Sequence, residues 1–225
     1  MAARGLTFDP DSHTYVLDGV EVPSVTGVLK RAGLIDFSSI PNGILETARA
    51  RGTVVHKAIH FFNENDLDVD RFAHDFPECI GYLDAWISFT RSRDFVPVLN
   101  ERRIASRQYQ LAGTADCFGL LDGLPILLDF ATGRPQDVAK DLQTAAYYAL
   151  ATEWAREDDP ELAAFLARSR GIVRRYGVAL RKDGTFSLDP YTAPTDFREF
   201  LTLVEAQRIV ARRRPAARTE LPEVA

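Results

Sequence analysis

Two aspartates stand on either side of a tight turn in the middle of the sequence. Asp116 precedes and Asp129 follows Leu121-Asp122-Gly123-Leu124, and Asp-Gly between two apolar runs favours a two-residue type I′ turn. In the register set by that turn, residue 121 faces residue 124, and the same count makes Asp116 face Asp129. Paired Cβ atoms are about 4.5–5.5 Å apart, so the two charges repel. One carboxylate must keep its proton, or a cation must lie between them.

The cation that suits two carboxylates at this spacing is a hard divalent ion, Mg²⁺ or Mn²⁺. Strand alternation places residue 131 on the same face as Asp129. A lysine there could orient an attacking water and offset charge that develops on a phosphate, but the residue is Ala131. The alternative is a pair of solvated aspartates at strand ends, and a one-residue bulge would break the register altogether.

The elements that must position these residues follow from apolar periodicity and turn residues. Strands are predicted over 95–104, 108–121 and 124–130, with hairpins over 6–22, around Asp18-Gly19, and over 171–181 with 184–188. Helices are predicted over 23–33, 43–63, 78–93, 136–156, 160–169 and 194–214, and an acidic loop over 63–70. This order predicts an α/β fold in which helices flank both faces of a mixed central sheet.

The length of 225 residues suits a single domain. We divide it into an N-terminal hairpin and short helix (1–42), a core that carries the aspartates (43–190), and a C-terminal helix and tail (191–225). With 46% hydrophobic and 26% charged residues, no apolar run near the ~20 residues of a membrane span and no N-terminal signal pattern, we expect a soluble, cytoplasmic protein without a membrane partner. Cys79 and Cys117 are expected to be reduced thiols.

Positive charge is concentrated near the C-terminus. Residues 168–218 contain twelve Lys or Arg and five acids, a local charge of +7, although the whole chain has a net charge of −5. This asymmetry fits a protein with one face that binds phosphate groups. The alternative is a solvated basic helix followed by a frayed tail at Arg212–Arg214.

Four short motifs occur in one order, namely RGTVVH (51–56), GTAD (113–116), LLDFATG (127–133) and QTAAY (143–147). Together they resemble the PD-(D/E)XK nucleases of the RecB-like branch. In that branch a helix ending in histidine is followed by Gly-x-x-Asp, a strand ending in Asp-x-Lys-Thr-Gly, and a helix with Gln-x-x-x-Tyr. The resemblance covers roughly residues 45–150 and implies a restriction-endonuclease-like fold. The size and PSVTGVL (23–29) look most like phage-type recombination exonucleases, relatives in kind of lambda exonuclease and other alkaline exonucleases.

The resemblance implies metal ligands at matching positions. His56, Asp116 and Asp129, with the carbonyl oxygen of Phe130, would hold one or two Mg²⁺ or Mn²⁺ ions. Glu101, before the hairpin, would join the metal site or hold a water, or else form a salt bridge at the strand edge.

The resemblance also implies contacts to DNA. Gln143 and Tyr147, four residues apart on one helix face, would contact the backbone near the scissile phosphate, unless the tyrosine simply packs in the core. A terminal 5′-phosphate would be held by four residues, unless these are only a helix cap and surface charges: Ser24, Thr26, Arg49 and Arg51.

Ala131 departs from the motif, which has lysine at that position. The chain is either a natural, degenerate member of the family or an engineered Lys→Ala variant. We favour the second explanation because the rest of the motif is intact. Cleavage is then expected to be impaired, and restoring lysine at 131 is expected to increase it.

The function implied is a Mg²⁺-dependent exonuclease that degrades one strand of double-stranded DNA from the 5′ end. The resemblance also implies a ring-shaped homotrimer and a single-strand annealing protein as a partner. The alternatives are a RecB-like nuclease for single strands or flaps, a non-catalytic DNA-end-binding protein and, more remotely, a zinc hydrolase suggested by the spacing of His56 and His60.

Overall fold

The computed structural model describes residues 5–36, 38, 40–132, 139–169 and 173–213, and all statements below concern these residues. The chain begins with a small antiparallel sheet of three strands, β1 (Leu6–Asp9), β2 (Thr14–Leu17) and β3 (Val20–Val22). Asp18 and Gly19 have φ angles of 50° and 85° between β2 and β3, as a type I′ turn requires. The predicted hairpin is therefore present, with β1 as an additional strand.

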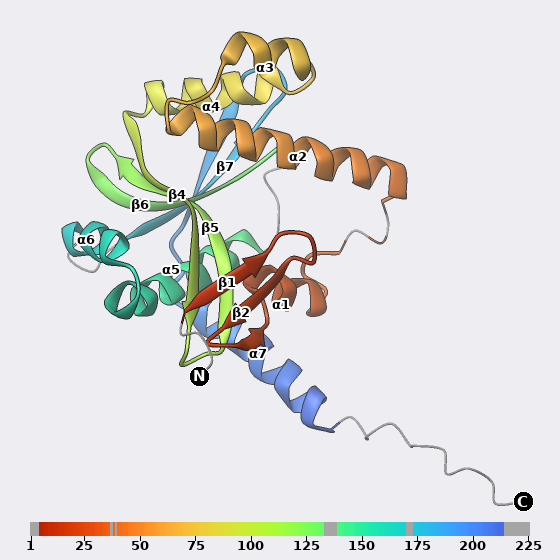
Figure 1. Ribbon diagram of the computed structural model, residues 1–225, viewed down its shortest axis with the longest axis vertical. Coiled ribbons are helices and arrows are strands. Elements are labelled where there is room, and N and C mark those ends of the chain that lie inside the picture. The colour runs from red at the N-terminus through yellow and green to blue at the C-terminus, as the bar shows by residue number, and fades with distance from the viewer. Residues whose placement is uncertain (1–4, 37, 39, 133–138, 170–172, 214–225) are drawn as a thin grey trace, which may run out of the picture.

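The central sheet has five strands in the order β4-β5-β6-β7-β8 (Figure 1). Their bounds are β4 (Phe95–Ser106), β5 (Leu111–Leu121), β6 (Leu124–Ala131), β7 (Arg174–Leu180) and β8 (Phe186–Tyr191). The pair β6–β7 is parallel and the other pairs are antiparallel. The mixed central sheet predicted from the sequence is confirmed.

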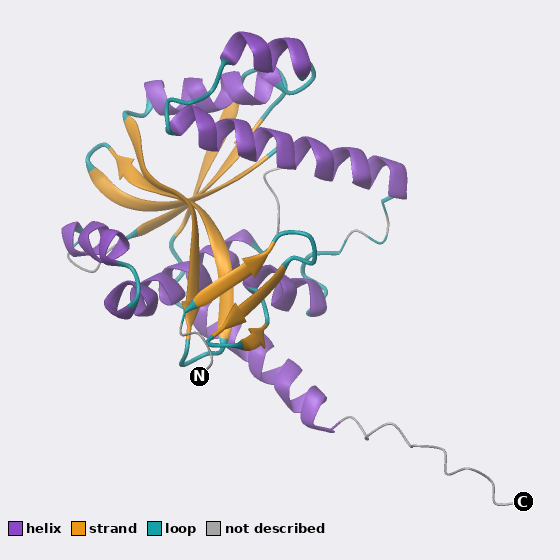
Figure 2. Cartoon of the chain, viewed as in Figure 1, coloured by secondary structure: helices purple, strands orange, loops and turns teal. Residues whose placement is uncertain are grey.

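Helices cover both faces of this sheet, as predicted (Figures 1 and 2). In the view of Figure 1, α2 (Asn42–Asn63), α3 (Val69–Asp75) and α4 (Ile80–Ser92) lie above it. The helices α1 (Val25–Arg31), α5 (Lys140–Glu157) and α7 (Asp196–Arg213) lie below, with α6 (Pro160–Arg168) beside them. Helix α3 was not predicted: most of 63–70 is a loop, as expected, but Asp68 caps a helix that buries Phe72.

Two hydrophobic cores result, one on each face of the sheet. Leu127 belongs to the core that includes residues of α1, α5, α6 and α7, whereas its neighbours Leu128 and Phe130 belong to the core that includes residues of α2 and α4. Adjacent residues of a strand point to opposite faces, so a strand covered on both sides is apolar throughout. Asp129 is the one charged residue inside this buried stretch of β6.

None of the helices in the described ranges is both long and apolar enough to cross a lipid bilayer.

Candidate metal centre

The turn between β5 and β6 sets the position of the two aspartates. The ladder runs without interruption from Leu121↔Leu124 to Cys117↔Leu128, which is the predicted register. Asp116 and Asp129 follow the last of these pairs. There the strands are joined differently, because the backbone N–H of Phe130 donates to Oδ2 of Asp116 at 3.0 Å. The carboxylate of Asp116 therefore lies at the junction of the two strands.

A third acid continues this row on the neighbouring strand. In β4, Glu101 lies between residues that pair with Cys117 and Ala115, so the same count places it opposite Asp116. Its φ angle is 47°, in the left-handed region that a residue with a side chain seldom adopts within a strand. Such strain persists only where the surrounding structure enforces it, and it is frequent at functional sites.

Helix α2 brings His56 to these acids. Its Nδ1 atom lies 3.5 Å from Oε1 of Glu101 and 3.9 Å from Oδ1 of Asp116, and its ring lies against that of Phe130, with 4.3 Å between centroids. One potential ligand atom from each of these three side chains lies within 4.8 Å of the others. This spacing allows a single ion to be shared by all three.

Oε1 of Glu101 adds an observation that favours an ion. It is buried and has no hydrogen-bond partner among the described residues. A possible donor, Nδ1 of His56, lies 3.5 Å away but does not form a hydrogen bond with it, and a bound cation would be a better partner for this buried oxygen.

Asp129 has a different partner from Asp116. Its side chain is only 3% exposed, and Oδ2 contacts the Nζ atom of Lys140, the first residue of α5. The group of three that lies within 4.8 Å therefore contains Glu101 where the resemblance implied Asp129. None of the four sequence motifs includes Lys140. The sequence nevertheless contains a signal for Lys140. It lies three residues before Gln143 and seven before Tyr147, and residues at i, i+3 and i+7 share one face of a helix.

Burial and mutual charge shift the pKa values of the cluster. Burial raises the pKa of Asp129 to about 6, although the charge of Lys140 opposes the shift. Burial likewise raises the pKa of Asp116, and the negative charge of Glu101 adds to the effect. Burial alone would lower the pKa of His56, but the carboxylates of Asp116 and Glu101 outweigh it and raise that pKa.

These shifts predict that divalent-ion binding weakens in acid. An ion needs neutral imidazole and ionised carboxylates, so protons compete with it as the pH falls towards the pKa of His56 and of Asp129. We expect Mn²⁺ to bind at least about tenfold more weakly at pH ~5.5 than at pH ~8, measured by isothermal titration calorimetry. Equal affinity at both values would contradict the assignment of these residues to an ion site.

Gln143 and Tyr147 are both buried. Nε2 of Gln143 donates to the hydroxyl of Tyr147 at 3.0 Å, and the hydroxyl of Thr26 lies 3.5 Å away from the same oxygen. The ring of Tyr147 packs over Gly113, where a Cβ atom would come within 2.6 Å of Cε1. The glycine of the GTAD motif thus makes room for the tyrosine of the QTAAY motif. In this state neither side chain presents a large surface to DNA.

The four residues expected to hold a terminal phosphate lie on two separate helices. Ser24 caps α1, where its Oγ accepts from the N–H of Gly27 at 3.0 Å, and α1 packs on α5 and α7. Helix α2, which carries the two arginines, packs on α4 and β4 instead. Arg49 is exposed, whereas Nη2 of Arg51 donates to the carbonyl oxygen of Thr132 at 3.3 Å.

Ala131 ends β6 and pairs with Ala179 of the parallel strand β7. Its neighbour Phe130 uses its ring to support His56 and its N–H to bind Asp116. The carbonyl oxygen of Phe130, which the resemblance implied as a ligand, is not part of the group identified by side-chain distances.

Part of the basic C-terminal segment serves internal contacts. Nη2 of Arg175 contacts Oδ2 of Asp196 at 2.7 Å, and both side chains are nearly buried. Arg208 binds Glu205 at 2.7 Å and also contacts the carbonyl oxygen of Tyr109. These arginines fasten α7 to the body of the protein, so only the remainder of the positive charge is left for a phosphate-binding face.

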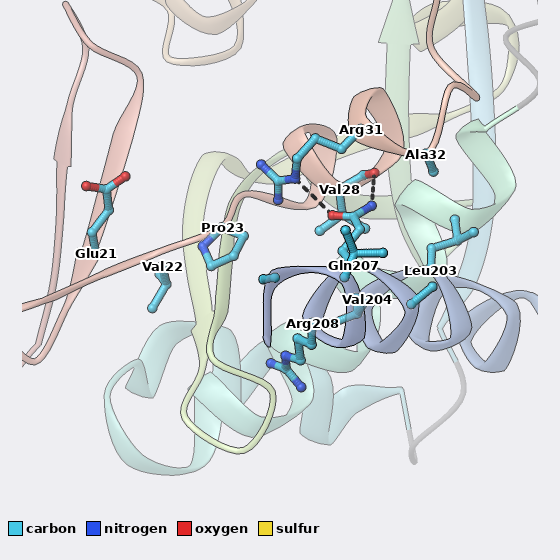
Figure 3. Close-up of a pocket in the computed structure, with 13 residues that line it drawn as sticks. Glu21, Val22, Pro23, Val28, Arg31, Ala32, Leu203, Val204, Gln207 and Arg208 are labelled. Atoms are coloured by element: carbon cyan, nitrogen blue, oxygen red, sulfur yellow. Dashed lines mark hydrogen bonds between the residues drawn. The ribbon is translucent and has the colours of Figure 1, made fainter. Parts of the chain in front are cut away.

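Apart from the acidic cluster, the structure has a groove of about 940 Å³ between α1 and the C-terminal half of α7 (Figure 3). Gln207 joins the two helices across it, accepting from Nε of Arg31 at 2.9 Å and donating to the carbonyl oxygen of Val28 at 2.8 Å. Its lining is largely aliphatic, and none of the acids described above contributes to it. The groove is therefore separate from the candidate metal centre.

Comparison with known proteins gives no family for the chain. Neither a scan against protein-family models nor a search of curated proteins finds a match.

Proposed function

We propose that this protein is a Mg²⁺- or Mn²⁺-dependent deoxyribonuclease. The observation that carries the proposal is the convergence of His56, Glu101 and Asp116, whose ligand atoms lie within 4.8 Å of one another, next to the buried carboxylate of Asp129. Carboxylate oxygens and an imidazole nitrogen are suitable ligands for Mn²⁺, and the carboxylates also suit Mg²⁺. The cysteines lie outside this group, so the ligand set lacks the thiolates that many zinc sites use.

The proposed reaction is hydrolysis of a phosphodiester. The oxygen of a water molecule forms a bond to phosphorus and the bond from phosphorus to one ester oxygen breaks. The leaving oxygen takes up a proton, while the water gives up one to solvent. The products are a phosphate monoester and a hydroxyl group. A bound divalent ion would lower the pKa of the water and neutralise charge on the phosphate.

The protein's own residues would hold and orient the reacting groups. Asp116 and Glu101 supply charge from two neighbouring strands, and His56 is kept in place by the ring of Phe130. The residues on either side of Glu101 in β4 pair with β5, and this pairing fixes the strained backbone of Glu101. Its carboxylate is therefore held in position at the site before any ligand binds.

The choice of DNA as the substrate is supported by the four motifs and by the remaining positive charge near the C-terminus. The more detailed expectation, an exonuclease that digests one strand of a duplex from its 5′ end as a ring-shaped homotrimer, depends on the resemblance to phage-type enzymes. Sedimentation of the protein with and without DNA tests the trimer, and a monomer in both conditions would remove it.

A cleavage assay with defined substrates tests the proposal. The unaltered chain is incubated with blunt duplexes labelled at either the 5′ or the 3′ end, with and without Mg²⁺ or Mn²⁺. We expect loss of one strand only when metal is present, with mononucleotides released from the 5′ end.

Three other results would redirect the proposal. Preference for single strands or flaps would favour the alternative of a RecB-like nuclease that acts on single strands or flaps. Tight binding to duplex ends without cleavage in either metal would leave a DNA-end-binding protein. Neither binding nor cleavage with either metal would overturn the assignment to DNA.

A further inference from the structure

The contact between Lys140 and Asp129 is unusual for both residues. Lysine is seldom withdrawn from water, and the beginning of a helix repels positive charge because its free N–H groups point outwards. Lys140 nevertheless occupies the first position of α5 with its side chain only 17% exposed. A lysine in such a place is held there by negative charge, and the charge is that of the cluster described above.

The direction of the side chain follows from the two elements that carry the pair. Leu127 of β6 points into the core shared with α5, so Asp129, two residues further, faces α5 as well. The contact with Asp129 places the ammonium group of Lys140 beside the row of Glu101, Asp116 and Asp129. Its positive charge acts on both aspartates.

Position 131 cannot supply that charge. It is on the same face of β6 as Asp129, and its side chain is a methyl group. Lys140 approaches the same carboxylate from the neighbouring helix. An ammonium group has three N–H donors, and among the described residues only Oδ2 of Asp129 is seen to accept one of them.

We propose that Lys140 is the cationic residue of this site, and that its ammonium group orients the attacking water and offsets charge on the phosphate during cleavage. The inference rests on the proposed nuclease function. The ammonium group acts by donating hydrogen bonds, so no proton or electron is added to the reaction given above. If Lys140 has this role, the chain does not need a lysine at 131, and Ala131 is compatible with full activity, in contrast to the impaired cleavage expected from the motif alone.

The test compares the unaltered chain with Lys140→Met, Lys140→Arg and the double variant Ala131→Lys/Lys140→Met. Cleavage of duplex DNA with saturating Mg²⁺, Mn²⁺ affinity by calorimetry, and the thermal midpoint are measured for each. Lys30→Met, which removes an exposed lysine of α1, is the matched control.

We expect Lys140→Met to slow cleavage by about 10²-fold or more, the usual effect of losing one group that stabilises a transition state. Its Mn²⁺ affinity is expected to stay equal or to rise, because a positive charge is removed from beside the ion. Ala131→Lys/Lys140→Met is expected to recover at least a tenth of the lost activity. Lys140→Arg is expected to retain more activity than Lys140→Met because it keeps the charge.

Two results would overturn the inference while leaving the proposed function intact. Faster cleavage by Lys140→Met, with tighter metal binding, would show that the lysine merely blocks the ion. Unchanged cleavage by a folded Lys140→Met would show that it has no role. If Lys140→Met does not fold, then failure of both cation-bearing variants, Lys140→Arg and the double variant, to cleave would also count against it. Absence of cleavage by the unaltered chain would instead remove both proposals.

Discussion

An Asp116→Asn variant is expected to cleave DNA at least about 10³-fold more slowly than the unaltered chain with Mg²⁺, a loss of about 4 kcal/mol of transition-state stabilisation. Oδ1 of Asp116 lies 3.9 Å from Nδ1 of His56, and the register of β4 with β5 places Asp116 opposite Glu101. The amide is a poor ligand for a divalent ion because it has lost the charge. Single-turnover cleavage and Mn²⁺ calorimetry measure the two effects.

The same substitution separates a metal ligand from a structural residue. The amide oxygen of asparagine can still accept from the N–H of Phe130, so the junction of β5 and β6 is kept. Because the pKa of Asp116 is raised in the folded protein by burial, ionisation above that pKa opposes folding, and a neutral side chain relieves this cost. Without metal, the thermal midpoint at pH ~8 is therefore expected to be unchanged or higher.

Asp66→Asn is the matched control for this experiment. Asp66 is an exposed aspartate in the loop after α2, and its replacement is expected to change neither cleavage nor stability appreciably. A folded Asp116→Asn variant with full Mg²⁺-dependent activity would rule out the metal centre.

The second large effect is expected on stability, from Asp159→Ala. The carboxylate of Asp159 is nearly buried, caps α6 by accepting from the N–H of Leu162 at 3.0 Å, and accepts two hydrogen bonds from the guanidinium group of Arg102. Removing Asp159 leaves the guanidinium group of Arg102 with only the exposed carboxylate of Glu161 and opens the N-terminal end of α6. We expect the free energy of unfolding to fall by about 3–5 kcal/mol, measured by urea denaturation.

Glu161→Ala provides the comparison for this variant. Glu161 binds the same Nη2 atom of Arg102 at 3.0 Å, but its side chain is 70% exposed. An exposed ion pair contributes little, so the loss is expected to stay below about 1 kcal/mol. Equal losses in the two variants would contradict the argument that burial makes the Arg102–Asp159 pair important.

The pH dependence of the second effect has a definite sign. Burial alone would raise the pKa of Asp159, but the guanidinium group of Arg102 and the N–H of Leu162 outweigh it and hold that pKa below its ordinary value of 3.8. The contribution to stability is therefore present above about pH 4 and lost as the pH falls through the lower, folded value. The difference between Asp159→Ala and the unaltered chain is expected to shrink in acid.

Local patterns were sufficient for most of the elements and for one register. Asp122-Gly123 adopts positive φ angles of 51° and 75°, and this turn alone fixes the pairing of β5 with β6. Helix and strand periodicity likewise located the elements around it, because a segment that buries one face must repeat apolar residues at the period of its own geometry. Helix α3 was missed because its seven residues bury a single large side chain, Phe72.

The sequence by itself determined the register from Leu121↔Leu124 to Cys117↔Leu128, since a two-residue turn leaves no freedom in the count. The direct pairing of Asp116 with Asp129, one step further, stays a prediction. Only the tertiary structure decided what each carboxylate contacts. Glu101 joins His56 and Asp116 because β4 pairs with β5 and α2 packs on β4, and Lys140 reaches Asp129 because α5 packs on that face of β6. Contacts between side chains on different elements depend on how helices dock on a sheet, and docking is set by the whole core, which no local spacing contains.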